Sequence, residues 1–194
     1  MRRLMVHEFI SLDGVIQAPG GADEDTDGGF AHGGWTLPYW HDDIGKHFDQ
    51  AMAQADTLLL GRKTWQIHGG AFEPMPAGDP FGDVMNGIRK IVVSTTLKSA
   101  ADWRNSTLIS SNVVEAVRNL KGQPGKDILI DGSSVLIHLL AENDLVDEYS
   151  FHVYPLVLGG GKRLFPEGKR INLKLVESKA LPTGVLFQRY QPAK

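Results

Sequence analysis

The sequence predicts an α/β fold in which a largely parallel central sheet is flanked by helices and ends in an antiparallel hairpin. Apolar runs of strand length alternate with helical patterns through the middle of the chain. Some of these runs end in small residues that open a helix, as strands of parallel sheets do. The last two strand-like segments, 173–179 and 185–191, are separated by Pro182-Thr183-Gly184, which favours a hairpin.

Length and composition indicate one ordinary globular domain, 1–194. The chain is 42% hydrophobic and 22% charged, and its formal net charge of -3 gives no reason to expect nucleic acid or an anionic membrane as a partner. Cysteine is absent, which excludes disulfides and thiolate chemistry, and we predict no metal site. The N-terminus lacks the apolar core of a signal peptide, and no apolar run approaches ~20 residues. We therefore expect a cytoplasmic protein.

The first strand is predicted at 4–10 by alternating residue character. Residues 11–16 continue it through a kink, where Asp13 and Gly14 form a strong turn signal. Residues 18–35 are rich in Gly and Asp and have little to bury, so we expect a long, solvated and mobile loop. Its acidic residues lack the spacing of an EF-hand calcium loop.

A helix is predicted at 42–55, directly after Trp40 and His41. Asp42 is a fitting N-cap for it. Its apolar residues recur at helical spacing. They are Ile44, Phe48, Ala51, Met52 and Ala55.

The stretch TLLLGRKTW is the most informative local unit. A strand at 57–60 runs into Gly61, and a helix starts near Lys63 and ends by 68–70. Free N–H groups and the helix dipole at such a turn favour an anion. Arg62 and Lys63 add cations suited to phosphate. The alternative is a plain βα turn with two solvated cations.

The next segments continue the alternation. Residues 71–87 hold several Pro and Gly and are predicted to be a long loop, and 89–94 is a buried strand. A short strand at 107–109 and a helix at 112–120 follow, the latter with Val113, Val117 and Leu120 facing inward.

The stretch ILIDGSSVLIHLL repeats the first unit. A strand at 128–130 meets Asp131, Gly132, Ser133 and Ser134 and then a helix, again with free donors facing an anion. In an α/β sheet the ligand lies outside the carboxyl ends of the strands. We therefore expect the residues after strands 4–10, 57–60, 91–94 and 128–130 to converge on one rim.

A strand at 150–158 then leads through Pro155 to three glycines and two cations. Pro155 suits a strand edge or bulge, and Gly159 and Gly160 permit a tight path. Lys162 and Arg163 place positive charge near that loop, where a phosphorylated ligand is one interpretation and a hairpin with exposed cations the other.

Five stretches together resemble one family. GRKTW after an apolar strand is similar to the segment of the dihydrofolate reductase fold that holds the NADPH phosphates. SLDGVI, RKIVVST, LVDEY and HVYPLVLGGGKRLF resemble the RibD C-terminal branch, the reductases of the riboflavin pathway. The last two are the most family-specific, and the resemblance covers nearly the whole chain. It implies a dihydrofolate reductase-like sheet and, without a preceding deaminase domain, a stand-alone member.

The resemblance implies NADPH as the cofactor. Arg62 pairs with its 2′-phosphate, Lys63 and Thr64 serve the pyrophosphate, and the turn at 132–134 lies beneath it. Ser94 and Thr95 contact the adenosine end, although a strand-to-loop cap explains them equally. The implied cofactor-binding residues are Gly61, Arg62, Lys63, Thr64, Ser94, Thr95, Gly132, Ser133 and Ser134.

The catalytic group is less well marked. The resemblance places Asp13 beside nicotinamide and substrate, and Asp42 or Asp43 as the analogue of the substrate-binding carboxylate. A turn residue and a dipole-favoured cap are the alternatives for these acids. His41 or water could also supply the proton. The candidates for substrate and loop contacts are Trp40, His41, Gly159 and Gly160.

Two residues depart from the family pattern. Asp131 stands where a glycine usually stands, and Ser133 replaces another. A carboxylate so close to the phosphates repels them unless it points away, or it caps the following helix. The loop after the first strand is implied as a lid over the cofactor.

The leading hypothesis is an NADPH-dependent reductase of a pteridine, folate or ribosylated aminopyrimidine, similar to 5-amino-6-(5-phosphoribosylamino)uracil reductase. The alternatives are a nucleotide-binding or regulatory module without catalysis and a true dihydrofolate reductase. The acidic loop argues against a highly anionic substrate. The resemblance also implies a homodimer that pairs through the sheet edge and its hairpin.

Overall fold

The computed structural model describes residues 1–165, 168 and 170–193. An eight-stranded sheet organises the chain, in the order β4-β3-β2-β5-β1-β6-β8-β7. The strands are β1 (Leu4–Ser11), β2 (Ala55–Gly61), β3 (Arg89–Val93), β4 (Ser106–Ile109), β5 (Asp127–Asp131), β6 (Glu148–Tyr154), β7 (Leu173–Ala180) and β8 (Leu186–Pro192). Strands β4 to β6 in this order pair in parallel, whereas β8 is antiparallel to β6 and β7.

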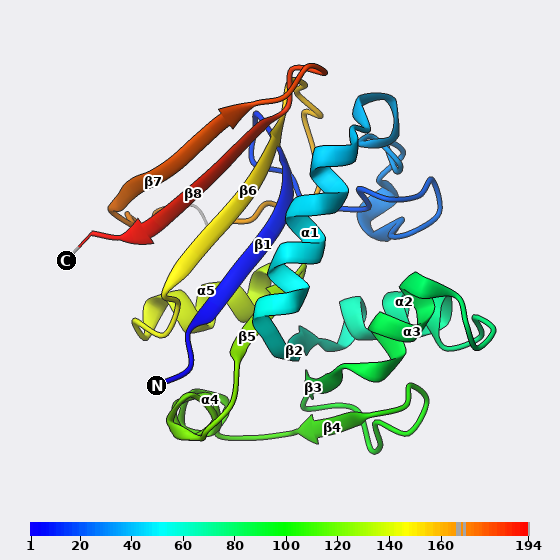
Figure 1. Cartoon of the computed structure of the whole chain (residues 1–194), viewed down its shortest axis with the longest axis vertical. Coiled ribbons are helices and arrows are strands. Elements are labelled where there is room, and N and C mark those ends of the chain that lie inside the picture. Colours follow the sequence, from blue (N-terminus) through cyan, green and yellow to red (C-terminus); the bar gives the residue numbers. More distant parts are fainter. Residues whose placement is uncertain (166–167, 169, 194) are drawn as a thin grey trace.

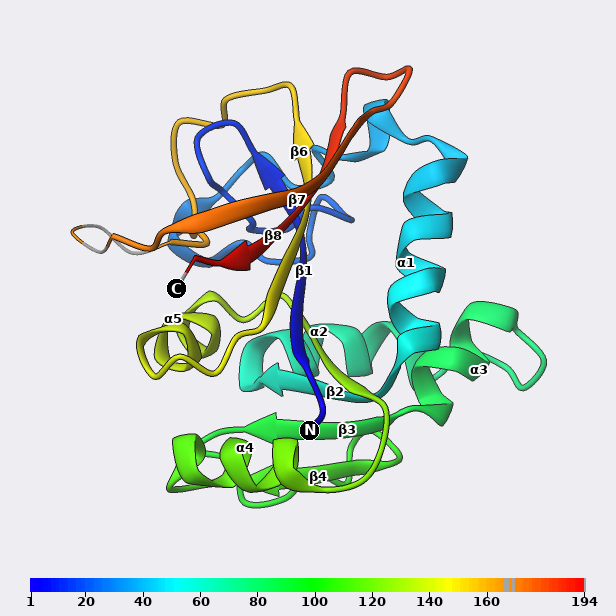
Figure 2. The same cartoon turned by 60° about the vertical axis from the view of Figure 1, so that its left-hand side comes forward.

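Helices cover both faces of the parallel part of the sheet (Figures 1 and 2). They are α1 (Asp42–Gln54), α2 (Arg62–Phe72), α3 (Pro80–Gly87), α4 (Val113–Gly122) and α5 (Ser134–Glu142), with short 3-10 helices at Asp27–Gly29 and Leu37–Tyr39. In the described part of the chain, none of them is both long and apolar enough to cross a bilayer.

The period of two along β1 separates two cores. Leu4 and Val6 pack with α4 and α5, whereas Met5 packs with α1, α2 and α3. Because both faces are covered, the central strands are continuously apolar, as in Leu58–Leu60. The predicted α/β class with a largely parallel sheet and a terminal antiparallel hairpin is confirmed. β7 forms the edge and is exposed along most of its length.

Helix α3 corrects the prediction of an uninterrupted loop at 71–87. Asp79 caps it by accepting hydrogen bonds from the N–H groups of Phe81 (3.1 Å) and Gly82 (2.7 Å), and Pro80 occupies its first turn. The fully buried Lys90 closes the other end by donating to the carbonyls of Met85 and Asn86 at 2.9 and 3.0 Å. The segment was predicted to be a loop because Gly and Pro are typical of loops, although Pro also fits the first turn of a helix.

The N-cap of α1 is a second correction. The helix begins at Asp42, so His41 occupies the capping position that the sequence assigned to Asp42. The Nδ1 atom of His41 accepts a hydrogen bond from the N–H of Asp43 at 3.2 Å. Asp42 instead lies in the first turn, where its negative charge favours the helix dipole.

The expectation that the segment 18–35 has little to bury is wrong. Phe30 and Trp35 join a third apolar cluster with Val15, Tyr154 and Val185. The indole N–H of Trp35 donates to the carbonyl of Gln17 at 2.8 Å, and further hydrogen bonds tie the segment together. This acidic segment is therefore folded against the carboxyl ends of the strands.

Candidate functional site

The turns that follow β2 and β5 are in direct contact. The N–H of Gly61 donates to Ser133 Oγ at 2.7 Å, and that hydroxyl bonds to Thr64 Oγ1 at 3.0 Å. Gly132 has a φ of 73°, and a Cβ added to it would lie 2.9 Å from Thr64 Cγ2. Glycine is thus required both by the backbone and by the close approach of α2.

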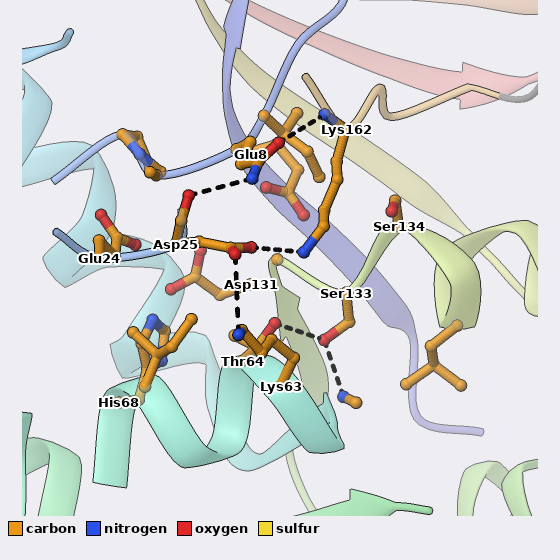
Figure 3. A pocket seen from close by; sticks show the side chains of 18 of the residues that line it. Glu8, Glu24, Asp25, Lys63, Thr64, His68, Asp131, Ser133, Ser134 and Lys162 are labelled. Carbon is orange, nitrogen blue, oxygen red and sulfur yellow. Dashed lines mark hydrogen bonds and ion pairs between the residues drawn. The ribbon is translucent and has the colours of Figure 1, made fainter. Parts of the chain in front are cut away.

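A polar cavity of about 260 Å³ opens over these two turns. It brings together most of the residues expected to bind a cofactor (Figure 3). Those that line it are Gly61, Arg62, Lys63, Thr64, Gly132, Ser133 and Ser134. The first turns of α2 and α5 line this space, and neither helix has a side-chain hydrogen bond from its N-cap residue, an arrangement that favours an anion.

Two lysines of this polar cavity are paired with the acidic segment. Lys63 Nζ lies 3.0 Å from Asp27 Oδ1, and Lys162 Nζ lies 2.6 Å from Asp25 Oδ2 and 2.7 Å from Asp27 Oδ2. These hydrogen bonds, first that of Lys162 and then that of Lys63, lower the pKa of Asp27 to about 2. The carboxylates thus occupy the positions where phosphate oxygens would meet the same cations.

Two acidic side chains lie at the floor, on the neighbouring strands β1 and β5. Glu8 is 3% exposed, and among the described residues its Oε1 atom has no hydrogen-bond partner. Burial and the nearby Asp131 raise the pKa of Glu8 well above its usual value, although the N–H of Gly132 opposes the shift. Burial raises the pKa of Asp131 to about 7. Ionising both carboxyls is unfavourable, so the pair retains a proton near neutral pH.

A larger, apolar pocket adjoins the polar cavity between α1, α2 and α3. Its volume is about 980 Å³, and Trp40, Phe48 and Phe72 are among the rings that line it. Asp131 and His68 line both spaces. Asp131 therefore stands at the junction of a phosphate-compatible cavity and an apolar pocket.

The chain matches the model of the RibD C-terminal domain over residues 2–187. It belongs to that family. The protein YyaP of Bacillus subtilis (strain 168), described as uncharacterized, is 31% identical over 189 residues, which span 95% of this chain and 92% of YyaP.

Solved structures share the fold of this RibD C-terminal domain. A candidate riboflavin biosynthesis protein from Shewanella sp. PV-4 superposes with a TM-score of 0.74 at 21% identity, covering 99% of both chains. The dihydrofolate reductase of Enterococcus faecalis, solved in complex with NADP(H), superposes with a TM-score of 0.62 at 17% identity, covering 99% of this chain and 97% of that one. These similarities establish the dihydrofolate reductase-like fold.

Several residues expected at the site lie outside the two cavities of this RibD C-terminal domain. Ser94 Oγ accepts hydrogen bonds from the N–H groups of Thr96 and Leu97, both at 3.1 Å, and so caps a turn. Thr95 is exposed. Neither lines the polar cavity or the apolar pocket.

The acids proposed from the sequence are also placed elsewhere. Asp13 accepts hydrogen bonds from the N–H groups of Leu158 (3.1 Å) and Gly159 (2.9 Å). Burial raises the pKa of Asp13, but these bonds and that from Ser11 outweigh it and bring the pKa to about 2. Asp42 is exposed and lines neither cavity.

Of the four residues proposed for substrate and loop contacts, Trp40 lines the apolar pocket. Gly160 lines a separate hollow beside Phe30 and Lys162. His41 caps α1, and Gly159 holds the carboxylate of Asp13.

Sequence reasoning missed three residues that line the polar cavity, namely Glu8, Glu24 and His68. Glu8 is an acidic residue on a strand whose other positions are almost all buried, which is an unusual placement. His68 is four residues after Thr64 on α2, and the spacing places both on one helix face. Both signals were present in the sequence, whereas the position of Glu24 depends on the folded loop.

Proposed function

We propose that the protein is an NADPH-dependent reductase of a small heteroaromatic molecule. The contact between the β2 and β5 turns carries the proposal, because it joins two helix N-termini and three cations around one cavity. The residues present fit a dinucleotide. Gly132 lets the β5 turn approach Thr64 closely, so both turns line one cavity, and Lys63 and Lys162 are held there by carboxylates that can yield to phosphates.

The proposed cofactor contacts follow from these positions. The backbone donors of 132–134 and the first turn of α2 hold the pyrophosphate, and Lys63 and Lys162 neutralise it after releasing Asp25 and Asp27. Arg62, exposed at the mouth, pairs with the 2′-phosphate. Ser94 and Thr95 remain candidates for the adenosine end. When bound, NADPH supplies a hydride to a ring carbon of the substrate and leaves as NADP⁺.

Asp131 is the proposed proton donor. With a pKa raised to about 7 by burial, its carboxyl is still partly protonated at neutral pH and can give the proton to a ring nitrogen. The carboxylate that remains takes up a proton again from water. Asp131 replaces Asp13 in this role because the pKa of Asp13 is about 2.

A binding module without catalysis is the second candidate. The ion pairs that Asp25 and Asp27 form with Lys162 favour a binding module, because these carboxylates bind the cation as a regulatory ligand would. The apolar pocket and the near-neutral carboxyl at its junction with the polar cavity favour the reductase, because binding a dinucleotide alone needs neither.

The test measures NADPH binding and NADPH oxidation separately. We expect Asp131→Asn to bind NADPH as the wild type does while kcat falls by about 100-fold to 10,000-fold, the range of general acid catalysis. Asp102→Asn, an exposed acid in a remote loop, is the matched control and should leave both unchanged. Binding without oxidation for every heterocycle offered would favour the module instead.

A homodimer through β7 is also part of the proposal. Leu175 and Val176 on this edge strand are 51% and 45% exposed, and an exposed edge is a template for pairing. Light scattering should give twice the monomer mass. Val176→Lys should shift the mass toward the monomer.

A further inference from the structure

The apolar pocket has walls suited to a flat ring. Phe72 and Phe81 stand edge to face with centroids 5.2 Å apart, and Phe48 lies 5.7 Å from Phe81. Trp40, 56% exposed, stands at the mouth. Aromatic walls of this kind stack on planar heterocycles and bury them.

Apart from His68, the ionisable side chains that line this pocket are all acidic. Among its lining residues that the structure describes, none is a lysine or an arginine. The acidic ones are Asp23, Glu24, Asp49 and Asp131. His68 adds no positive charge at neutral pH, because burial lowers its pKa to about 4.

The cations near the apolar pocket form hydrogen bonds or ion pairs with other side chains. Arg62 is on the same helix as His68, but it lines the polar cavity and donates to Gln66 Oε1 at 3.2 Å. Lys46 and Lys179 both bind Asp43, at 2.9 and 2.7 Å. A phosphate or carboxylate entering the apolar pocket would therefore meet like charge and find no cation.

We propose that the apolar pocket binds an unconjugated, phosphate-free aromatic heterocycle, uncharged or protonated, of the simple pterin class. This inference rests on the proposed function and selects among its substrates. The phosphoribosyl aminopyrimidines carry a phosphate, and folates end in a glutamate with two carboxylates. Both need a cation that the described pocket does not offer.

Two polar groups can orient such a ring. Asp131 lies at the inner end, where the pocket meets the polar cavity. His68 Nδ1 is buried without a hydrogen-bond partner among the described residues, so a ring substituent can satisfy it. An apolar pocket with a few convergent polar groups is the usual form of a specific small-molecule site.

Calorimetry on the protein with NADP⁺ present tests the inference without turnover. The probes are 6-methyl-7,8-dihydropterin, 7,8-dihydrofolate and 5-amino-6-(5-phosphoribosylamino)uracil. We expect the dihydropterin to bind at least about 10-fold more tightly than either anionic probe, with the difference shrinking at high salt.

Charge reversal sharpens the test. Asp49→Arg places a cation at the pocket mouth and should tighten both anionic probes by about 10-fold while the dihydropterin changes little. Glu115→Arg, exposed on α4, makes the same change in net charge away from the pocket and should alter none of the three.

The outcomes separate the two proposals. The inference is overturned if the wild type binds either anionic probe as tightly as the dihydropterin or more tightly. It is also overturned if the dihydropterin does not bind while NADPH does. Both results leave the reductase proposal standing. Failure to bind NADPH overturns the proposed function. The inference is then decided by the relative affinities of the three probes, measured by calorimetry without NADP⁺.

Discussion

The polar cavity and the apolar pocket share Glu24, His68 and Asp131, but among the described lining residues only the polar cavity has lysine or arginine. The polar cavity contains Arg62, Lys63 and Lys162 as well as the carboxyl groups of Glu8 and Asp25, set around two helix N-termini. The apolar pocket is lined by rings and carboxylates. This difference is the basis of the proposal that the polar cavity binds phosphate and the apolar pocket excludes it.

The largest expected effect comes from disturbing the close packing of the two turns that line the polar cavity. In Gly132→Ala the new Cβ meets Thr64 Cγ2 at 2.9 Å, at a φ of 73° that alanine rarely adopts. We expect NADPH affinity to fall by about 100-fold, measured by fluorescence titration, while dihydropterin binding in the apolar pocket is retained. Gly122→Ala, where a Cβ meets nothing within 4 Å, is the control. Loss of both ligands together would show that the two spaces are not separable.

Removing Arg62, the cation at the mouth of the polar cavity, should weaken the binding of NADPH but not that of NADH. We expect Arg62→Ala to weaken NADPH by about 1–3 kcal/mol and NADH little, because only NADPH carries the 2′-phosphate. Arg118→Ala on α4, also exposed, controls for the change in net charge. An equal loss for NADPH and NADH would contradict the assignment.

The raised pKa of Asp131, which lies where the two spaces meet, should change how the free energy of unfolding depends on pH. The folded-state pKa of Asp131 is raised to about 7, above an unfolded value near 3.8. Its ionisation therefore costs stability above neutral pH, and the cost disappears as pH falls from about 7 toward the unfolded pKa. We expect Asp131→Asn to unfold at higher denaturant concentration than wild type under alkaline conditions, with the advantage shrinking on acidification. A stability difference between Asp131→Asn and the wild type that does not vary with pH would show that the pKa of Asp131 is not raised in the folded protein.

The smallest effect concerns the paired lysines. Asp27→Asn removes a carboxylate that bonds to both Lys63 and Lys162. We expect NADPH to bind a few times more tightly, because its phosphates no longer displace that charge, and the anionic probes in the apolar pocket to be unaffected. Weaker NADPH binding would indicate that the acidic segment helps to form the polar cavity.

Local patterns predicted the fold and the two strand-to-helix turns that line the polar cavity. The strands and the two strand-to-helix turns follow from residue period and from glycine, and parallel strands bring their ends together. This was enough to place the turn at Gly61 and the turn at 132–134 on one rim of the sheet. Helix α3 was hidden because Asp79 and Pro80, which start it, also serve as loop residues.

The charge arrangement could not be predicted in the same way. Asp25 and Lys162 are 137 residues apart in sequence and meet only through the fold. Asp131 was treated as an obstacle to phosphate, because its protonation depends on burial against Glu8, which the sequence does not show. Long-range contacts and burial therefore decide which acids have a raised pKa and which have a lowered one.

A crystal structure of the protein with NADP⁺ and 6-methyl-7,8-dihydropterin tests the division of the site most directly. We expect the phosphates against 132–134, Lys63 and Lys162, and the pterin ring in the apolar pocket with Asp131 between the two ligands. Phosphate density in the apolar pocket, or a dinucleotide bound away from Gly132, would contradict it.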